Sequence, residues 1–171
     1  MNRFGIFGIG FTIMIIILIQ IVIFKNLVFY GSAFCFFYVL ALFMMPIDTN
    51  PLVQLLSGFL IGLVIDMSYN TQGVHASAST AIMFLRPFWI NMLSPGSGYG
   101  SVVRINIKTQ GLQWFLTYAY PLILIHCLIL FFVEAFGFSN FWMTMSKSFY
   151  SSLFTLFIVV VIQYLFFSKQ K

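Results

Sequence analysis

Few residues in this chain could do acid–base or metal chemistry. The 171 residues include three acids and two histidines. An intramembrane aspartyl protease needs two aspartates that share a proton, but Asp48 lies in the turn sequence "PIDTNP". A zinc protease needs helical ligands three or four residues apart, whereas Glu134 follows His126 by eight residues. We therefore expect no enzyme, no cofactor and no metal site, and we expect His126 to be a hydrogen-bonded core residue.

The composition instead indicates a membrane protein. Hydrophobic residues make up 61% of the chain and charged residues 6%, against about 25% charged in an ordinary soluble domain. A membrane-spanning helix needs about 20 mainly apolar residues. Six apolar segments come near this length, at residues 5–24, 28–45, 52–67, 73–93, 114–134 and 149–167. The run "FTIMIIILIQIVIF" lacks the alternation of a barrel strand, so the sequence predicts an all-α, polytopic helical membrane protein with five to six spans, the segment 52–67 being the shortest.

The net charge of +5 is explained by membrane orientation rather than by nucleic-acid binding. Short cytoplasmic loops are enriched in lysine and arginine. With six spans and a cytoplasmic N-terminus, the basic residues inside are Arg3, Arg104, Lys108, Lys169 and Lys171. Lys25 and Lys147 lie outside. We therefore expect a multi-pass protein with both termini in the cytoplasm.

One long polar connection interrupts the apolar segments. Residues 94–111 read "SPGSGYGSVVRINIKTQG", and these glycines are followed by no GK[ST] phosphate-binding sequence. We expect a cytoplasmic strap, part of which could lie on the lipid headgroups or pair as a short strand. The whole chain, 1–171, is then a single integral membrane domain in the lipid bilayer.

The stretch "GFLIGLVID" places small residues and an acid on one helix face. Gly58, Gly62 and Asp66 are four residues apart, and residues at this spacing share a face. Small residues allow another helix to approach closely. The stripe could pack within the bundle or form a contact between subunits, such as a homodimer. We hypothesise that it marks the face that receives a partner helix.

The predicted topology brings ionisable groups to the outer ends of three helices. Asp66 ends one apolar segment, His75 begins the next, and Glu134 ends the fifth. One interpretation is that Asp66 caps the turn "SYNTQG" while Glu134 is solvated at the interface. The other is a polar patch at the outer face that binds a partner.

The stretch "GFLIGLVIDMSYNTQGVHASA" resembles the signature of the rod-shape-determining protein MreD family, in which a glycine-spaced helix ends in Asp and is followed by Gly-x-His-Ala. The matching residues are Gly58, Gly62, Asp66, Gly73, His75 and Ala76. The segments "FLRPF" and "LILIHCLILFFVEAF" are also similar to MreD proteins of the Bacteroidetes type.

This resemblance implies a non-enzymatic subunit of the bacterial cell-elongation machinery in the inner membrane. Its expected partners are the bitopic protein MreC, the cell-wall synthases and the complex linked to MreB filaments. The family is similar in architecture to the substrate-binding subunits of energy-coupling-factor transporters. The alternative function is therefore a vitamin-like small-molecule binding subunit of a membrane transporter.

Overall fold

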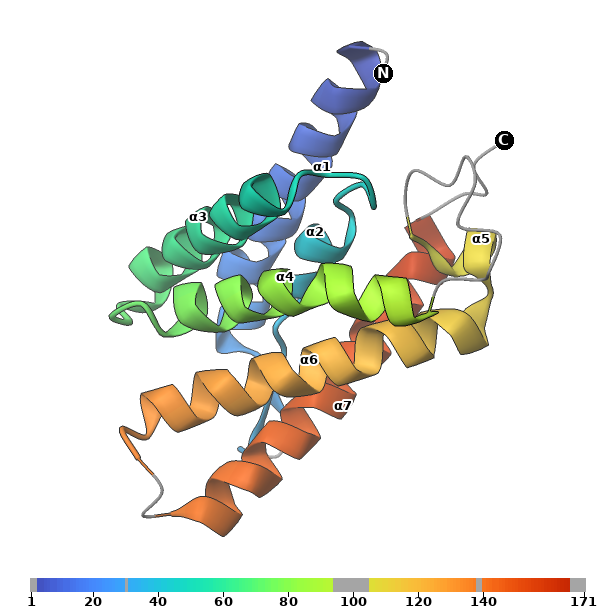
Figure 1. The fold of residues 1–171 in the computed structure, drawn as a ribbon. Coiled ribbons are helices and arrows are strands. Elements are labelled where there is room, and N and C mark those ends of the chain that lie inside the picture. The colour runs from blue at the N-terminus through green and yellow to red at the C-terminus, as the bar shows by residue number, and fades with distance from the viewer. Residues whose placement is uncertain (1–2, 30, 94–104, 138–139, 167–171) are drawn as a thin grey trace.

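The computed structural model describes residues 3–29, 31–93, 105–137 and 140–166 (Figure 1). The elements in chain order are α1 (Arg3–Val22), the 3-10 helix η1 (Phe24–Asn26), β1 (Val28–Phe29), β2 (Ala33–Phe34), α2 (Val39–Phe43), α3 (Pro51–Tyr69), α4 (Val74–Leu93), α5 (Ile107–Gln110), α6 (Leu112–Glu134) and α7 (Phe141–Phe166). In Figure 1, α4 and α6 lie side by side across the middle, with α3 against α4 and α7 against α6. The predicted helical fold class is confirmed.

Three helices in the described part of the chain are long and apolar enough to cross a membrane: α3, α6 and α7. The shortest predicted segment, 52–67, corresponds to α3, which has 19 residues. Its start follows local rules, because the Asn50 side chain accepts a hydrogen bond from the N–H of Leu52 at 2.8 Å and Pro51 occupies the first helical position.

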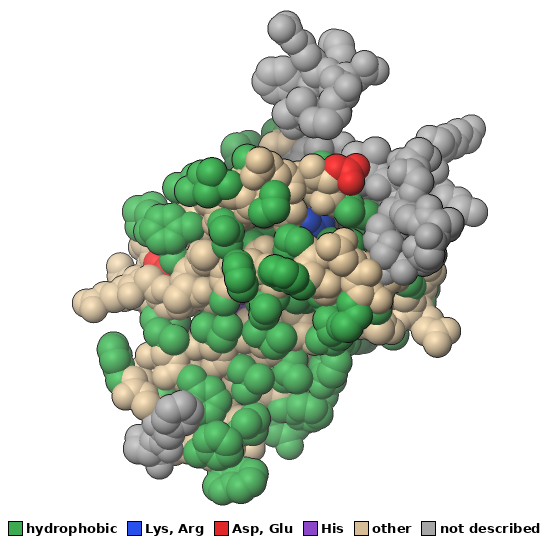
Figure 2. All heavy atoms as spheres, in the orientation of Figure 1, with side chains coloured by type: hydrophobic (Ala, Val, Ile, Leu, Met, Phe, Trp, Pro, Cys, Tyr) green, Lys and Arg blue, Asp and Glu red, His purple; other side chains and the backbone are tan. Residues whose placement is uncertain are grey.

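The polarity of α7 is inverted relative to a helix of a water-soluble protein. Its buried face carries mainly small or polar side chains, namely Thr144, Ser148, Ser151, Ser152, Thr155, Val159 and Gln163. Its exposed face includes Tyr150, Leu153 and Phe157. Figure 2 shows hydrophobic side chains spread over the visible surface. This distribution suits lipid, where apolar side chains gain little by moving inward and small residues let helices approach closely.

The prediction of a spanning helix over residues 28–45 is wrong. The strands β1 and β2 pair antiparallel as a short hairpin, and the chain then continues to the five-residue helix α2. The bundle encloses the later part of this segment, where Tyr38, Val39 and Leu40 are fully buried, whereas Val28 and Phe29 are exposed. Apolar composition alone does not distinguish a buried irregular segment from a lipid-facing helix.

Hydroxyl groups of α7 make this irregular backbone compatible with the bundle interior. The N–H of Phe34 donates to Ser151 Oγ, and the N–H of Phe36 donates to Thr155 Oγ1, both at 3.0 Å. Non-helical backbone at membrane depth is tolerated where the surrounding protein satisfies its polar groups. Ser151 and Thr155 on the polar face of α7 are therefore explained by the segment that they support.

Residues 94–104 of the predicted strap lie outside the described residues. The remainder of the strap is not loose on the surface, because Ile105 and Ile107 are buried and α5 packs against α6 and α7. The N–H of Ile107 donates to Gln163 Oε1 at 3.3 Å. This end of the strap is anchored in the bundle.

Candidate functional site

Asp66 joins the end of α3 to the beginning of α4. Its side chain is buried, and its carboxylate accepts the backbone N–H of His75 at 3.0 Å and that of Ala76 at 2.8 Å. Both N–H groups belong to the first turn of α4, where they have no partner within the helix. A carboxylate is favourable at a helix N-terminus because of the helix dipole. Asp66 therefore caps α4 from the preceding helix.

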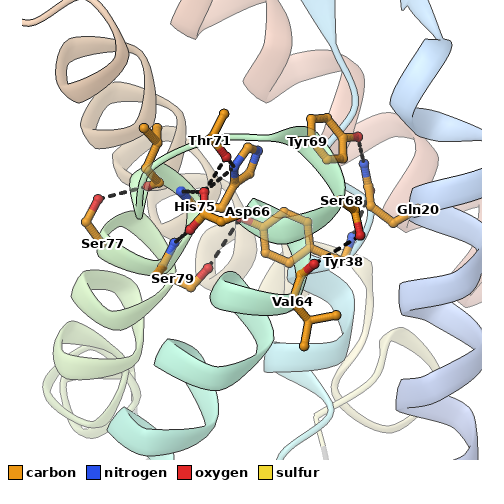
Figure 3. A network of polar contacts seen from close by, with 12 residues as sticks. Gln20, Tyr38, Val64, Asp66, Ser68, Tyr69, Thr71, His75, Ser77 and Ser79 are labelled. Carbon is orange, nitrogen blue, oxygen red and sulfur yellow. Dashed lines mark hydrogen bonds and ion pairs between the residues drawn. The ribbon is translucent and has the colours of Figure 1, made fainter.

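Two side chains complete the shell of the Asp66 carboxylate (Figure 3). The Thr71 hydroxyl donates to Asp66 Oδ1, and His75 Nδ1 lies 3.0 Å from the same oxygen. The turn that brings them back includes Asn70 in a left-handed conformation, with φ of 56°, and Gly73 with φ of 82°. Asn and Gly adopt positive φ more readily than other residues. We call Asp66, Thr71, His75 and Ala76 the α3–α4 joint.

Gly58 and Gly62 lie on the face of α3 that packs against α4. A Cβ atom at Gly62 would lie 2.5 Å from Ala76 Cα, and one at Gly58 would lie 2.9 Å from the Ser79 carbonyl oxygen. The interpretation as packing within the bundle is confirmed. It corrects the hypothesis that this stripe receives a partner helix, because α4 of the same chain already occupies the face.

A second polar cluster lies beside the joint. His126 Nε2 is 2.6 Å from the Tyr38 hydroxyl, and the Ser79 hydroxyl donates to the same Tyr38 oxygen at 3.3 Å. The rings of Phe36 and Tyr38 contact both His75 and His126, with centroid distances of 5.4 to 6.0 Å. The expectation that His126 is a hydrogen-bonded core residue is confirmed.

Gln20 ties α1 into the same region. Its side-chain amide donates to the Tyr69 hydroxyl at 2.7 Å and to the Cys35 carbonyl at 3.1 Å, while its oxygen accepts the N–H of Tyr38 at 3.1 Å. The Tyr69 ring lies 4.9 Å from the His75 ring, centroid to centroid. Gln20, in a mainly apolar helix, thus fixes α1 to the end of α3 and to the irregular segment (Figure 3).

Glu134 does not enter the joint. Its carboxylate pairs with Lys147 of α7 at 3.5 Å, and its side chain is 50% exposed. The Lys147 ammonium also lies 4.4 Å from the centre of the Phe131 ring. The predicted outer patch is therefore divided into a buried pair, Asp66 with His75, and a separate surface pair, Glu134 with Lys147.

Sequence reasoning assigned no site role to Arg86, which is fully buried. Its guanidinium donates to the Tyr118 hydroxyl at 2.8 Å, to Gln54 Oε1 at 3.1 Å and to the Met45 carbonyl at 2.6 Å. It thereby connects α4 to α6, to α3 and to the chain just after α2. The sequence signal for this role is an arginine inside an apolar segment, because charged residues within a membrane usually pair with polar groups in the bundle interior.

The fold and the two polar clusters are those of a helical membrane protein, in which buried polar residues hold the helices of the chain together. In the described part of the chain, no three histidine, cysteine, aspartate or glutamate side chains gather where they could hold a metal ion. Comparison with family models, curated proteins and solved structures found no match.

Proposed function

We propose that this chain is a non-enzymatic subunit of the bacterial cell-elongation machinery, similar to MreD. It resides in the inner membrane as a multi-pass protein, with both termini in the cytoplasm. Its partners are an MreC-like bitopic protein, cell-wall synthases and the MreB-linked complex. In this role it acts by presenting surfaces to these proteins rather than by chemistry.

The proposal is supported most by the position of the residues that carry the resemblance. Gly62 and Asp66 of α3 meet His75 and Ala76 at the beginning of α4, and Gly58 packs further along α4, against Ser79. The Asp66 carboxylate is surrounded by four donor groups from the turn and α4. A carboxylate used in this way fixes the angle between two helices, which is what a subunit with a scaffolding role requires.

The surfaces of α3 and α4 that remain for a membrane partner are apolar. The outward face of α3 exposes Leu56, Phe59 and Leu60, and α4 exposes Phe84 and Phe88. The α3–α4 joint fixes the position of these two exposed faces relative to each other. A membrane partner could therefore be selected by shape across α3 and α4 without contacting the glycine stripe.

The test is purification of the intact chain from its native membrane in mild detergent, followed by mass spectrometry of proteins and of extracted small molecules. The proposal predicts a co-purifying bitopic protein with a periplasmic coiled coil, together with cell-wall synthases. Recovery of a stoichiometric vitamin or other metabolite with ATPase subunits would contradict it and favour the transporter alternative.

Two variants make this experiment specific to the joint. Asp66→Asn alters the cap of α4, whereas Asp48→Asn makes the same chemical change at an exposed turn residue. We expect the first to reduce recovery of the bitopic protein and the second to leave it unchanged. Equal recovery with both variants would mean that partner binding does not depend on the joint.

A further inference from the structure

A groove of about 490 Å³ lies between α1 and α7, away from the α3–α4 joint. Its floor is the buried segment around α2. The lining residues are Thr12, Ile15, Ile16, Ile19, Ile23, Phe24, Phe37, Leu40, Ile162 and Phe166. The proposed function assigns nothing to this groove.

The lining is chemically uniform. Apart from Thr12, every lining side chain is aliphatic or aromatic. The Thr12 hydroxyl donates to the Gly8 carbonyl of its own helix at 2.8 Å, so its hydrogen is already used. Among the described residues, the groove thus offers no unused side-chain donor, and these residues recognise an occupant through apolar contact.

The length of the groove distinguishes between a lipid acyl chain and a membrane-spanning helix as its occupant. It runs from Thr12, near the middle of α1, to Phe24, just beyond the end of that helix. Twelve helical steps correspond to about 18 Å. The hydrocarbon core is about 30 Å thick, so the groove covers little more than one leaflet. A spanning helix of a partner would need the full thickness, whereas one acyl chain needs a single leaflet.

The groove is continuous with the lipid-facing surface. Ile15 and Ile23 on its edge are 38% and 56% exposed, so it opens sideways toward the bilayer. Lys25 directly follows the last lining residue of this region, and its ammonium donates to the Ser68 carbonyl. Because an ammonium has three N–H donors, Lys25 retains capacity for a second acceptor, such as a lipid phosphate.

We propose that this groove binds one acyl chain of an outer-leaflet phospholipid, with the phosphate of that lipid at the level of Lys25. The chain fills the space between α1 and α7, and it contacts Phe37 and Leu40 of the buried segment. The lipid is then a structural component of the bundle, and it links α1 to the rest of the protein.

Photolabelling of the unaltered chain tests the site directly. The intact protein is reconstituted in nanodiscs of phosphatidylethanolamine and phosphatidylglycerol that carry a diazirine in one acyl chain, and labelled peptides are mapped after irradiation. We expect labels concentrated on residues 12–24 and 37–40. Labelling no stronger there than on the lipid-facing residues Phe59 and Phe88 would overturn the proposal.

A matched pair of variants on α1 tests retention. Ile19→Trp fills the groove, whereas Leu18→Trp changes a neighbouring residue that is 52% exposed and outside it. Native mass spectrometry after delipidation should find one retained phospholipid on the unaltered chain and on Leu18→Trp, and loss of that lipid from Ile19→Trp. Equal retention by both variants, or recovery of a lipid-free dimer joined through this groove, would contradict the proposal. Because the photolabelling uses the unaltered chain, it tests lipid binding in the groove even if Ile19→Trp does not fold.

Discussion

Asp66 near the end of α3 accepts the backbone N–H of Ala76 in the first turn of α4 at 2.8 Å. The same carboxylate holds the N–H and the ring of His75. One acid thus satisfies the beginning of the next helix and fixes the turn between the two. This relation explains why a carboxylate follows the glycine stripe at this spacing.

Replacing Asp66 by Asn should destabilise the bundle by about 2 kcal/mol, since hydrogen bonds to charged groups contribute roughly 1.5 to 3 kcal/mol. The amide keeps one acceptor oxygen and places an NH₂ group against donors of α4. The thermal unfolding midpoint in detergent measures the effect. Asp48→Asn, at an exposed turn, is the control and should leave the midpoint unchanged. An equal shift in both variants would contradict the capping role.

Replacing Gly62 by Ala should separate α3 from α4. The added Cβ would lie 2.5 Å from Ala76 Cα, which is backbone and has no rotamer with which to move aside. We expect a lower unfolding midpoint, with a cost of about 1 to 3 kcal/mol, as found for overpacked sites. Gly8→Ala on α1 is the matched control, because nothing lies within 4 Å of its added Cβ. If both substitutions behave alike, the close approach of the two helices is not what requires glycine.

The glycine stripe, the acid and the five long helices α1, α3, α4, α6 and α7 could be predicted from apolar segments, residue spacing and turn residues. The segment 28–45 could not, because apolar residues such as Phe37 and Leu40 look the same in a lipid-facing helix and in a buried irregular chain. The pairing of Glu134 with Lys147 also could not be predicted from the sequence, because it depends on how α6 and α7 pack. The sequence predicted that Asp66 and His75 lie at the same end of their helices. That Asp66 accepts the backbone N–H groups of His75 and Ala76 is seen only in the structure.

Arg86 should be required for folding because it satisfies groups from several elements. Arg86→Met leaves Gln54, Tyr118 and the Met45 carbonyl without their donor, and buried unsatisfied groups cost about 1 to 3 kcal/mol each. We expect a large loss of folded protein, with Arg86→Lys recovering part of it. The yield of monodisperse protein in detergent provides the measurement. Lys147→Met removes a cation whose side chain is 31% exposed and should have a much smaller effect.

The hydroxyl of Thr155 should support the irregular segment. Thr155→Val keeps the shape of the side chain and removes the acceptor of the Phe36 N–H, which is buried. The expected cost is about 1 to 3 kcal/mol. Hydrogen exchange at Phe36 should also become faster. Thr117→Val is the control, because the Thr117 hydroxyl lies on the exposed face of α6 and donates to the Gln113 carbonyl of the same helix. Unchanged exchange at Phe36 would show that α7 does not stabilise this backbone.

The most direct test of the proposed function is the cell shape of the native bacterium after depletion of this chain. We expect elongated cells to become shorter and wider. The unaltered chain and Asp48→Asn should restore the length-to-width ratio, and Asp66→Asn should not. Cells that keep their length-to-width ratio after complete depletion would contradict a role in cell elongation.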